Sequence, residues 1–131
     1  ELLKPTKIYN NVIKQILSEN IEIKAMSHIT GGGMPENLPR CIPSDFIPYI
    51  NTNSWDIPIL FKFLKDKGKI PEKDVWNTFN LGVGFCLIID KQFKDSIFHI
   101  CKDHEIDSWE IGKIVPKSDS TISKFLPEIL T

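Results

Sequence analysis

Three consecutive glycines, Gly31, Gly32 and Gly33, follow His28 and Thr30 and form the most distinctive stretch of the chain. Glycine adopts positive φ without steric cost, so such a run is typical of a sharp turn or of backbone that comes close to a ligand. Successive backbone N–H groups at the turn, together with the start of a helix, can bind an anion such as phosphate. The competing interpretation is a strand-to-helix turn without a ligand, because the run matches neither GxGxxG nor the P-loop pattern.

His28 is the candidate catalytic residue beside this turn. Near neutral pH an imidazole can donate a hydrogen bond to a phosphate or transfer a proton. The alternative is a histidine at the end of a strand whose ring is hydrogen-bonded to a backbone carbonyl. The other two histidines, His99 and His104, are five residues apart on an expected helix, which is a poor spacing for a shared metal ion. We therefore expect no metal site in the chain.

Arg40 lies shortly after the glycines and can bind a phosphate through two parallel hydrogen bonds. A salt bridge to Glu36, four residues earlier, is the competing account. A second turn with glycines, residues 80–84, precedes an apolar strand. The residues alone therefore predict one or two glycine-lined anion sites, and they specify no reaction.

The elements that position these residues follow from the spacing of apolar side chains. Helical spacing predicts helices over residues 8–17, 34–42, 56–68, 70–79 and 90–104. Strand periodicity predicts strands over residues 23–30, 44–53, 85–89 and 109–115. In the first strand, His28 and Thr30 project from the same face, beside the glycine turn. We expect an α+β fold, a layered sandwich in which helices cover a mixed or antiparallel sheet of about four strands.

Prolines and capping residues set the expected ends of several elements. Pro39 should end or kink the second helix, because it lacks the N–H that a helix interior uses. Pro48 is expected to place its strand at the edge of a sheet. Asp56 is expected to cap the third helix, which Gly68 ends.

The last two strands have features of their own. Residues 85–89 are uniformly apolar, so this strand is expected to be central and covered on both faces. The strand at 109–115 is interrupted by Gly112, where we expect a bulge or a close approach of backbone. No internal repeat is present, and the elements are expected to form one folded unit.

The composition is that of a single globular domain. The chain has 131 residues, of which 41% are hydrophobic and 25% charged, with a formal net charge of −1. Its lysines are interspersed with acids, so we expect no nucleic-acid partner. Because no apolar run approaches the ~18 residues of a membrane span and no signal peptide is recognised, we expect no membrane contact and a cytoplasmic location. Cys41, Cys86 and Cys101 are expected to be reduced core thiols.

Four local motifs and the first residues of the chain form a longer pattern. The motifs are His-Ile-Thr-Gly-Gly-Gly-x-x-Glu-Asn-x-Pro-Arg at 28–40, Ser-Trp with a following proline at 54–58, Thr-Phe-Asn-x-Gly-x-Gly at 78–84 and Ile-Gly at 111–112. Glu-Leu-Leu-Lys-Pro-Thr-Lys-Ile-Tyr at 1–9 precedes them. Together they resemble the C-terminal domain of the aminoimidazole ribonucleotide synthetase (phosphoribosylformylglycinamidine cyclo-ligase) family.

The resemblance implies that the chain consists of a folded domain and a polar tail. Residues 1–115 are expected to form the family's C-terminal domain, and residues 116–131 a polar, partly mobile tail. The apolar residues of the tail, which are expected to pack back on the domain, are Phe125, Leu126, Ile129 and Leu130.

The family that the chain resembles couples ATP cleavage to ring closure. ATP phosphorylates the amide-type oxygen of formylglycinamidine ribonucleotide, and a nitrogen then attacks, expels phosphate and closes the ring of aminoimidazole ribonucleotide. Magnesium accompanies the nucleotide, and the protein must stabilise charge on the transferring phosphoryl oxygens. The resemblance therefore implies an ATP-dependent ligase of purine synthesis, of which this chain is the substrate- and phosphate-binding half.

The resemblance also assigns roles to residues and partners. His28 would contact substrate or phosphate. The residues expected to line the substrate and phosphate site are Thr30, Gly31, Gly32, Gly33, Arg40, Asn80, Gly82 and Gly84. ATP and magnesium would be bound mainly by the family's N-terminal ATP-binding domain, which this sequence lacks and which carries most of the homodimer contact. We therefore expect the chain alone to fold without catalysing turnover.

Two kinds of alternative stay open. One is a related ATP-using enzyme, such as selenophosphate synthetase, thiamine-monophosphate kinase or formylglycinamidine ribonucleotide amidotransferase, although the motifs at 36–40 and 78–84 favour the synthetase. The other is a non-catalytic binding module that keeps the fold. Separate titrations with substrate ribonucleotide and ATP discriminate between them, because a pure scaffold binds neither.

Overall fold

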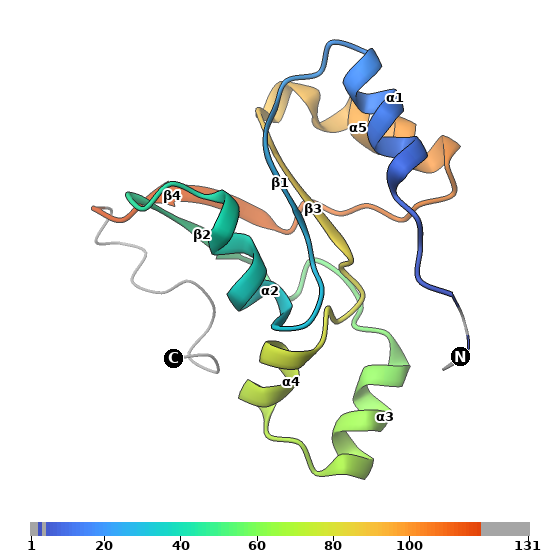
Figure 1. Cartoon of the computed structure of the whole chain (residues 1–131), viewed down its shortest axis with the longest axis vertical. Coiled ribbons are helices and arrows are strands. Elements are labelled where there is room, and N and C mark those ends of the chain that lie inside the picture. The colour runs from blue at the N-terminus through green and yellow to red at the C-terminus, as the bar shows by residue number, and fades with distance from the viewer. Residues whose placement is uncertain (1–2, 4, 119–131) are drawn as a thin grey trace.

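The computed structural model describes residue 3 and residues 5–118 (Figure 1). In chain order the elements are α1 (Asn10–Ser18), β1 (Ile23–His28), α2 (Gly33–Asn37), the 3₁₀ helix η1 (Leu38–Cys41), β2 (Phe46–Ile50), α3 (Ile59–Gly68), α4 (Glu72–Thr78), β3 (Phe85–Ile89), the 3₁₀ helix η2 (Lys91–Phe93), α5 (Lys94–Asp103) and β4 (Gly112–Pro116). The predicted packing of Phe125, Leu126, Ile129 and Leu130 lies outside the described residues.

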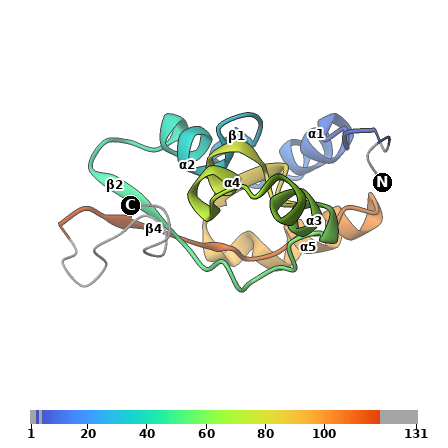
Figure 2. The same cartoon turned by 90° about the horizontal axis from the view of Figure 1, so that it is seen from below.

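Within the described residues, four strands pair as two antiparallel sheets of two strands each. β1 pairs with β3, with His28 opposite Phe85, and β2 pairs with β4, with Pro48 opposite Ile114. Helices α1 and α5 lie together near one end of β1, whereas α2 and α4 lie near its other end (Figure 1, Figure 2). The fold is therefore α+β with the expected four strands, which are divided between two sheets in place of one.

β3 is not the central strand that its apolar sequence predicts. In the described part of the chain it pairs with β1 alone, and Cys86 is its only buried residue. Leu87 and Ile89 pack against the cluster of α1 and α5, while Ile88 lines an open apolar cavity of about 1300 Å³. The prediction is wrong because an apolar run indicates that a strand needs cover, whereas the number of its partner strands depends on distant parts of the chain.

Two apolar clusters hold the elements together. The first joins the end of β1 to α2, α4 and the loops that flank them; its buried members are Ile29, Met34, Leu38, Ile50, Trp55, Val75, Trp76, Leu81, Val83 and Cys86. The second joins α1 to α5; its buried members are Val12, Ile16, Ile21, Ile97, Ile100 and Cys101. Both glycine turns rest on the first cluster, which we call the site core.

The observed helix ends agree with the sequence at Pro39 and disagree at Asp56. α2 stops at Asn37 and the chain continues as η1, because Pro39 offers no N–H to an α-helix interior. α3 begins only at Ile59, with Pro58 in an extended conformation at the cap position and no side-chain cap. The prediction that Asp56 caps α3 is therefore wrong, because the fixed φ of Pro58 lets the helix start two residues later.

The remaining predicted breaks lie close to where they were expected. Gly68 is the last residue of α3, but the left-handed residue that follows the helix is Lys69, with φ 50°. Pro48 lies in a two-stranded sheet, in which each strand is an edge. A side chain at Gly112 would overlap the backbone carbonyl of Tyr49, and the register of β2 and β4 is regular. The predicted feature at Gly112 is thus a close approach of backbone and not a bulge.

The three cysteines are free thiols. Cys86 and Cys101 are buried, and Cys41 is half-buried. Burial raises the pKa of the Cys86 thiol to about 12, so it is protonated at neutral pH. Cys86 and Cys101 therefore behave as small apolar core residues, as the sequence predicts. Within the described residues, no helix is long and apolar enough to cross a membrane.

Trp55 ties the loop before α3 to the second glycine turn. Its indole N–H donates a hydrogen bond of 2.9 Å to the backbone carbonyl of Leu81, inside the site core. Trp55→Phe should lower the free energy of unfolding by about 1–3 kcal/mol, because the buried carbonyl loses its donor. Urea unfolding of the chain measures this. The control is Trp109→Phe, at an exposed tryptophan, where we expect a change below about 0.5 kcal/mol; equal effects of the two changes would contradict the prediction.

Candidate functional site

The first glycine turn connects β1 to α2. The amide of Gly33 donates to the carbonyl of Thr30 at 3.0 Å, and both Gly32 (φ 92°) and Gly33 (φ 58°) adopt left-handed backbone. A side chain at Gly33 would also overlap the backbone carbonyl of Trp76 in α4. Gly31 has no positive φ and has open space around its Cα. The three glycines therefore differ: the fold itself requires Gly33, whereas Gly31 is free of structural demands.

Asn37 holds this turn, a structural role that its place in the motif did not predict. It is only 5% exposed, and its side-chain amide donates to the carbonyls of Gly31 (3.1 Å) and Gly33 (2.7 Å). The Thr30 hydroxyl donates weakly to the side-chain oxygen of Asn37 at 3.5 Å, and the Ser27 hydroxyl donates to the backbone carbonyl of Asn37 at 3.1 Å. The signal in the sequence is a polar side chain four positions after Gly33, the spacing at which one helical turn brings it back to the glycine.

The second glycine turn is equally well fixed. The side-chain oxygen of Asn80 accepts from the amide of Gly82 at 3.1 Å, and its carbonyl accepts from the amide of Val83 at 2.9 Å. Leu81 (φ 51°) and Gly82 (φ 97°) both adopt left-handed backbone. A side chain at Gly82 would come within 2.7 Å of Cδ of Pro58. The predicted close approach at Gly82 is therefore to the chain itself.

The two turns meet at a small cavity. Its volume is about 230 Å³, and its lining residues are Ile29, Thr30, Phe61, Thr78, Phe79 and Asn80. Thr30 comes from the first motif and Asn80 from the second, so the structure brings together two residues that are fifty positions apart in the sequence. Phe61, on α3, was not predicted, because no motif surrounds it. The cavity combines hydroxyl and amide groups with aromatic walls, which is suited to a small polar ligand.

His28 and Gly84 lie beside the first turn in an aromatic cluster. The amide of Ile29 donates to the carbonyl of Gly84 at 2.9 Å, which joins the end of β1 to the start of β3. The exposed ring of His28 packs against Phe85, with ring centroids 5.9 Å apart, and against Tyr9 at 6.1 Å. In the described residues His28 has no hydrogen bond to a backbone carbonyl, so its contacts there are aromatic.

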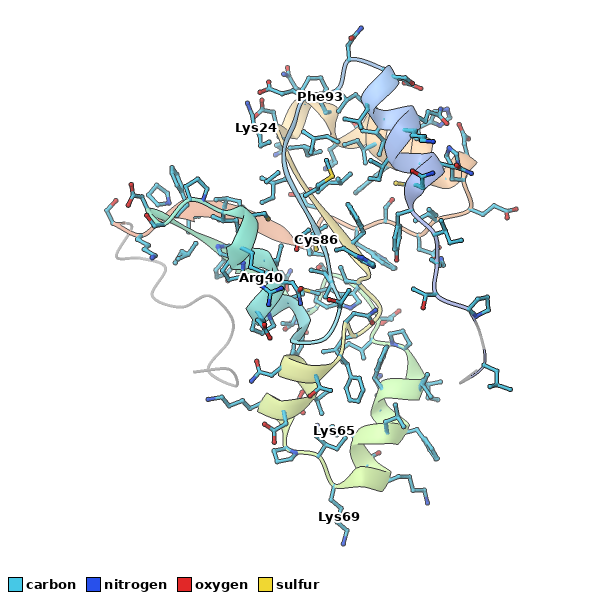
Figure 3. All side chains as sticks on the ribbon, viewed as in Figure 1. Lys24, Arg40, Lys65, Lys69, Cys86 and Phe93 are labelled. Carbon is cyan, nitrogen blue, oxygen red and sulfur yellow. The ribbon has the colours of Figure 1, made fainter. Side chains whose placement is uncertain are left out.

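Arg40 does not lie at the cavity. Arg40, which is labelled in Figure 3, forms the salt bridge with Glu36 that was the competing account. Both side chains are largely exposed, at 62% and 58%. The Glu36 carboxylate in turn lies against Gly32, where an added side chain would overlap it. An anion at the first turn must therefore compete with a carboxylate that is already neutralised by Arg40.

The described residues contain no group of three or more histidine, cysteine, aspartate or glutamate side chains with the geometry of a metal site. The Glu36 carboxylate, which lies against the first glycine turn, is engaged by Arg40. Within the described residues, the chemistry available at the two glycine turns is therefore hydrogen bonding from backbone, hydroxyl and amide groups, together with the exposed imidazole of His28.

Comparison with known proteins agrees with the motifs. The family model for the C-terminal domain of AIR synthase related proteins matches residues 1–124. A phosphoribosylformylglycinamidine cyclo-ligase of Prochlorococcus marinus strain MIT 9312 is 91% identical over 131 residues, which are 100% of this chain and 38% of that protein. A protein of the same name from strain MIT 9313 is 45% identical over 120 residues, covering 92% of this chain and 35% of that protein. The chain thus spans about 38% of the length of the first of these relatives and 35% of the second. It belongs to the AIR synthase related family, as a C-terminal domain of that family.

Proposed function

We propose that this chain is the substrate- and phosphate-binding part of a phosphoribosylformylglycinamidine cyclo-ligase, an ATP-dependent ligase that closes formylglycinamidine ribonucleotide to aminoimidazole ribonucleotide in purine synthesis. The observation that carries the proposal is the cavity at which Thr30 and Asn80, from two separate motifs, meet. The names of relatives that are up to 91% identical support the same activity for the complete enzyme.

In this proposal the first turn supplies donors for phosphate oxygens. No described residue accepts a hydrogen bond from the amides of Gly31 and Gly32, and the Thr30 hydroxyl lies at the cavity beside them. Backbone amides that are already in place stabilise developing negative charge without reorganisation. The Thr30 hydroxyl would join them by giving up its weak hydrogen bond of 3.5 Å to the side-chain oxygen of Asn37. We assign the same role to the Asn80 side of the cavity, and we assign to His28 a contact with substrate or phosphate.

Arg40 can join this site by exchanging partners. Its pair with Glu36 is exposed, and an exposed ion pair contributes only about 0–1 kcal/mol. A guanidinium bound to phosphate through two hydrogen bonds is substantially stronger. We propose that an incoming phosphate displaces Glu36 from Arg40, which leaves the guanidinium over the first turn.

ATP supplies the phosphoryl group of the reaction, and magnesium would neutralise part of its charge. The described residues do not fit a magnesium ion by themselves, because they offer no cluster of acidic ligands. We therefore propose that the N-terminal ATP-binding domain of the same enzyme supplies most of the nucleotide and magnesium contacts. We further propose that the intact enzyme is a cytoplasmic homodimer.

Thr30→Val tests the proposed site in the complete enzyme. The change keeps the shape of the side chain and removes one hydroxyl, so the KM for the ribonucleotide should rise about tenfold. Thr52→Val, at a half-buried threonine outside the cavity, is the matched control and should leave KM unchanged. Equal KM values for the two variants would remove Thr30 from the site.

The division of labour has its own test. The 131-residue chain should bind substrate ribonucleotide and release no ADP, whereas the complete enzyme releases ADP with each ring closure. Turnover by the chain alone, at the rate of the complete enzyme, would contradict the proposal. Failure of the complete enzyme to bind either substrate ribonucleotide or ATP would support a non-catalytic module instead.

A further inference from the structure

Three aromatic rings from separate parts of the chain meet beside the first glycine turn. Tyr9 precedes α1, His28 ends β1 and Phe85 begins β3. The Tyr9 ring meets His28 edge to face, with planes at 70°, and lies 5.3 Å from Phe85. His28 and Phe85 are also direct partners across the two strands. The exposed imidazole is therefore flanked by one ring from its neighbouring strand and one from the α1 segment.

Tyr9 is held firmly in this position. Its carbonyl accepts from the amide of Ile13 at 3.0 Å, which fixes it to the first turn of α1. The phenol is half-buried, and this burial raises the pKa of Tyr9, so the hydroxyl is neutral at physiological pH. Rings that are anchored in this manner restrict the rotamers of a neighbour, because edge-to-face contacts depend on orientation.

Gly84 provides the space that Tyr9 occupies. A Cβ at Gly84 would overlap the Tyr9 hydroxyl oxygen and would lie 3.1 Å from Cζ of the same ring. Gly84 has no positive φ, so its backbone conformation is open to any residue. The absence of a side chain at Gly84 is therefore explained by the phenol and not by a positive φ. The role in phosphate binding that the resemblance implies for Gly84 stays a prediction.

We infer that Tyr9 is a positioning residue for His28, and that Gly84 serves this arrangement by leaving room for the Tyr9 hydroxyl. The inference rests on the proposed function in one respect, namely that His28 acts on substrate or phosphate. The contact with His28 is made by the ring of Tyr9, whereas the contact with Gly84 is made by its hydroxyl. These two halves of one side chain can be tested separately.

A double-mutant cycle in the complete enzyme tests the arrangement. Gly84→Ala should displace the Tyr9 ring and lower kcat about tenfold, with little change in KM, because a small misplacement of a reacting group is costly. Tyr9→Phe keeps the ring and should stay within about twofold of wild type. In the Tyr9→Phe background, Gly84→Ala should be tolerated, because the overlapping oxygen is gone and the remaining ring atom can shift by a few tenths of an ångström. Absence of this rescue would overturn the assignment of Gly84.

The His28 ring signal tests the contact without any activity measurement. In the complete enzyme with ¹³C-labelled histidine and no substrate, the ring resonance of His28, assigned with His28→Gln, should shift in Tyr9→Leu and stay in place in Tyr9→Phe. An unchanged resonance in Tyr9→Leu would overturn the positioning role. Because no substrate is present, this result is independent of the proposed role of His28 in the reaction, which would fail separately if His28→Gln kept full kcat.

Discussion

Replacing Gly33 with alanine is expected to lower the free energy of unfolding by about 3–5 kcal/mol, whereas the same change at Gly31 should cost less than about 1 kcal/mol. At Gly33 two penalties act together. The backbone has φ 58°, which strains any residue with a Cβ, and the added carbon would overlap the carbonyl of Trp76, which is fixed in α4. Neither penalty acts at Gly31, where no atom lies within 4 Å of an added Cβ.

Gly32 completes the series as an intermediate case. Its φ of 92° is also left-handed, and an added Cβ would meet only the side chain of Glu36, overlapping its carboxylate and lying 2.8 Å from its Cβ. We expect Gly32→Ala to cost about 1–3 kcal/mol, from the strain of the backbone and a small displacement of Glu36. Urea unfolding of the chain measures all three variants, and the soluble yield on expression ranks any that do not fold. An order other than Gly33, Gly32, Gly31 in decreasing cost would contradict the geometry of the turn.

This series shows what the sequence could predict about the glycine turn and what it could not. Glycines after a strand predict a sharp turn, and β1, the turn and α2 are indeed found in that order. The different demands on the three glycines come from Trp76 in α4 and from Glu36, neither of which is fixed by local spacing. Local rules give the conformation, whereas tertiary contacts decide which residue is indispensable.

The same distinction explains the correct and incorrect predictions of the fold. Pro39 and Pro48 act through their own missing N–H, so their effects could be predicted. The partners of β3 and the start of α3 depend on which segments meet in space, and these predictions were wrong. At the site, the meeting of Thr30 and Asn80 could be expected only through the resemblance, and Phe61 carried no local signal.

Arg40 gives an instructive case of competing local rules. The salt bridge to Glu36 needs only helical spacing, whereas binding of phosphate needs an anion at the right distance. The structure has the first arrangement, and the second stays a proposal that requires an exchange of partners. Sequence spacing therefore predicts the observed salt bridge of Arg40, whereas its binding of phosphate needs a separate test.

Asn37→Asp should lower the free energy of unfolding by about 3–5 kcal/mol at neutral pH. The substitution changes hardly any volume, but it replaces the donor that serves the carbonyls of Gly31 and Gly33 with an oxygen that repels them. The new carboxylate would be almost fully buried without a cation, so its pKa should rise above the usual value. Once protonated, the new carboxyl group can again donate a hydrogen bond. The loss of unfolding free energy relative to wild type should therefore shrink as the pH is lowered from about 8 to about 5.

Asn51→Asp is the matched control for this prediction. Asn51 is exposed, and its side-chain oxygen accepts a hydrogen bond of 3.1 Å from the amide of Asn53, a bond that aspartate can also accept. We expect a change below about 0.5 kcal/mol, with no comparable recovery at low pH. Urea unfolding of both variants across this pH range measures the difference. Similar losses of unfolding free energy in the two variants would show that donation to the glycine carbonyls does not hold the turn. A loss in Asn37→Asp that grows as the pH falls would show the same. The expected pattern makes Asn37 the residue that fixes the position of the Gly31 and Gly32 amides.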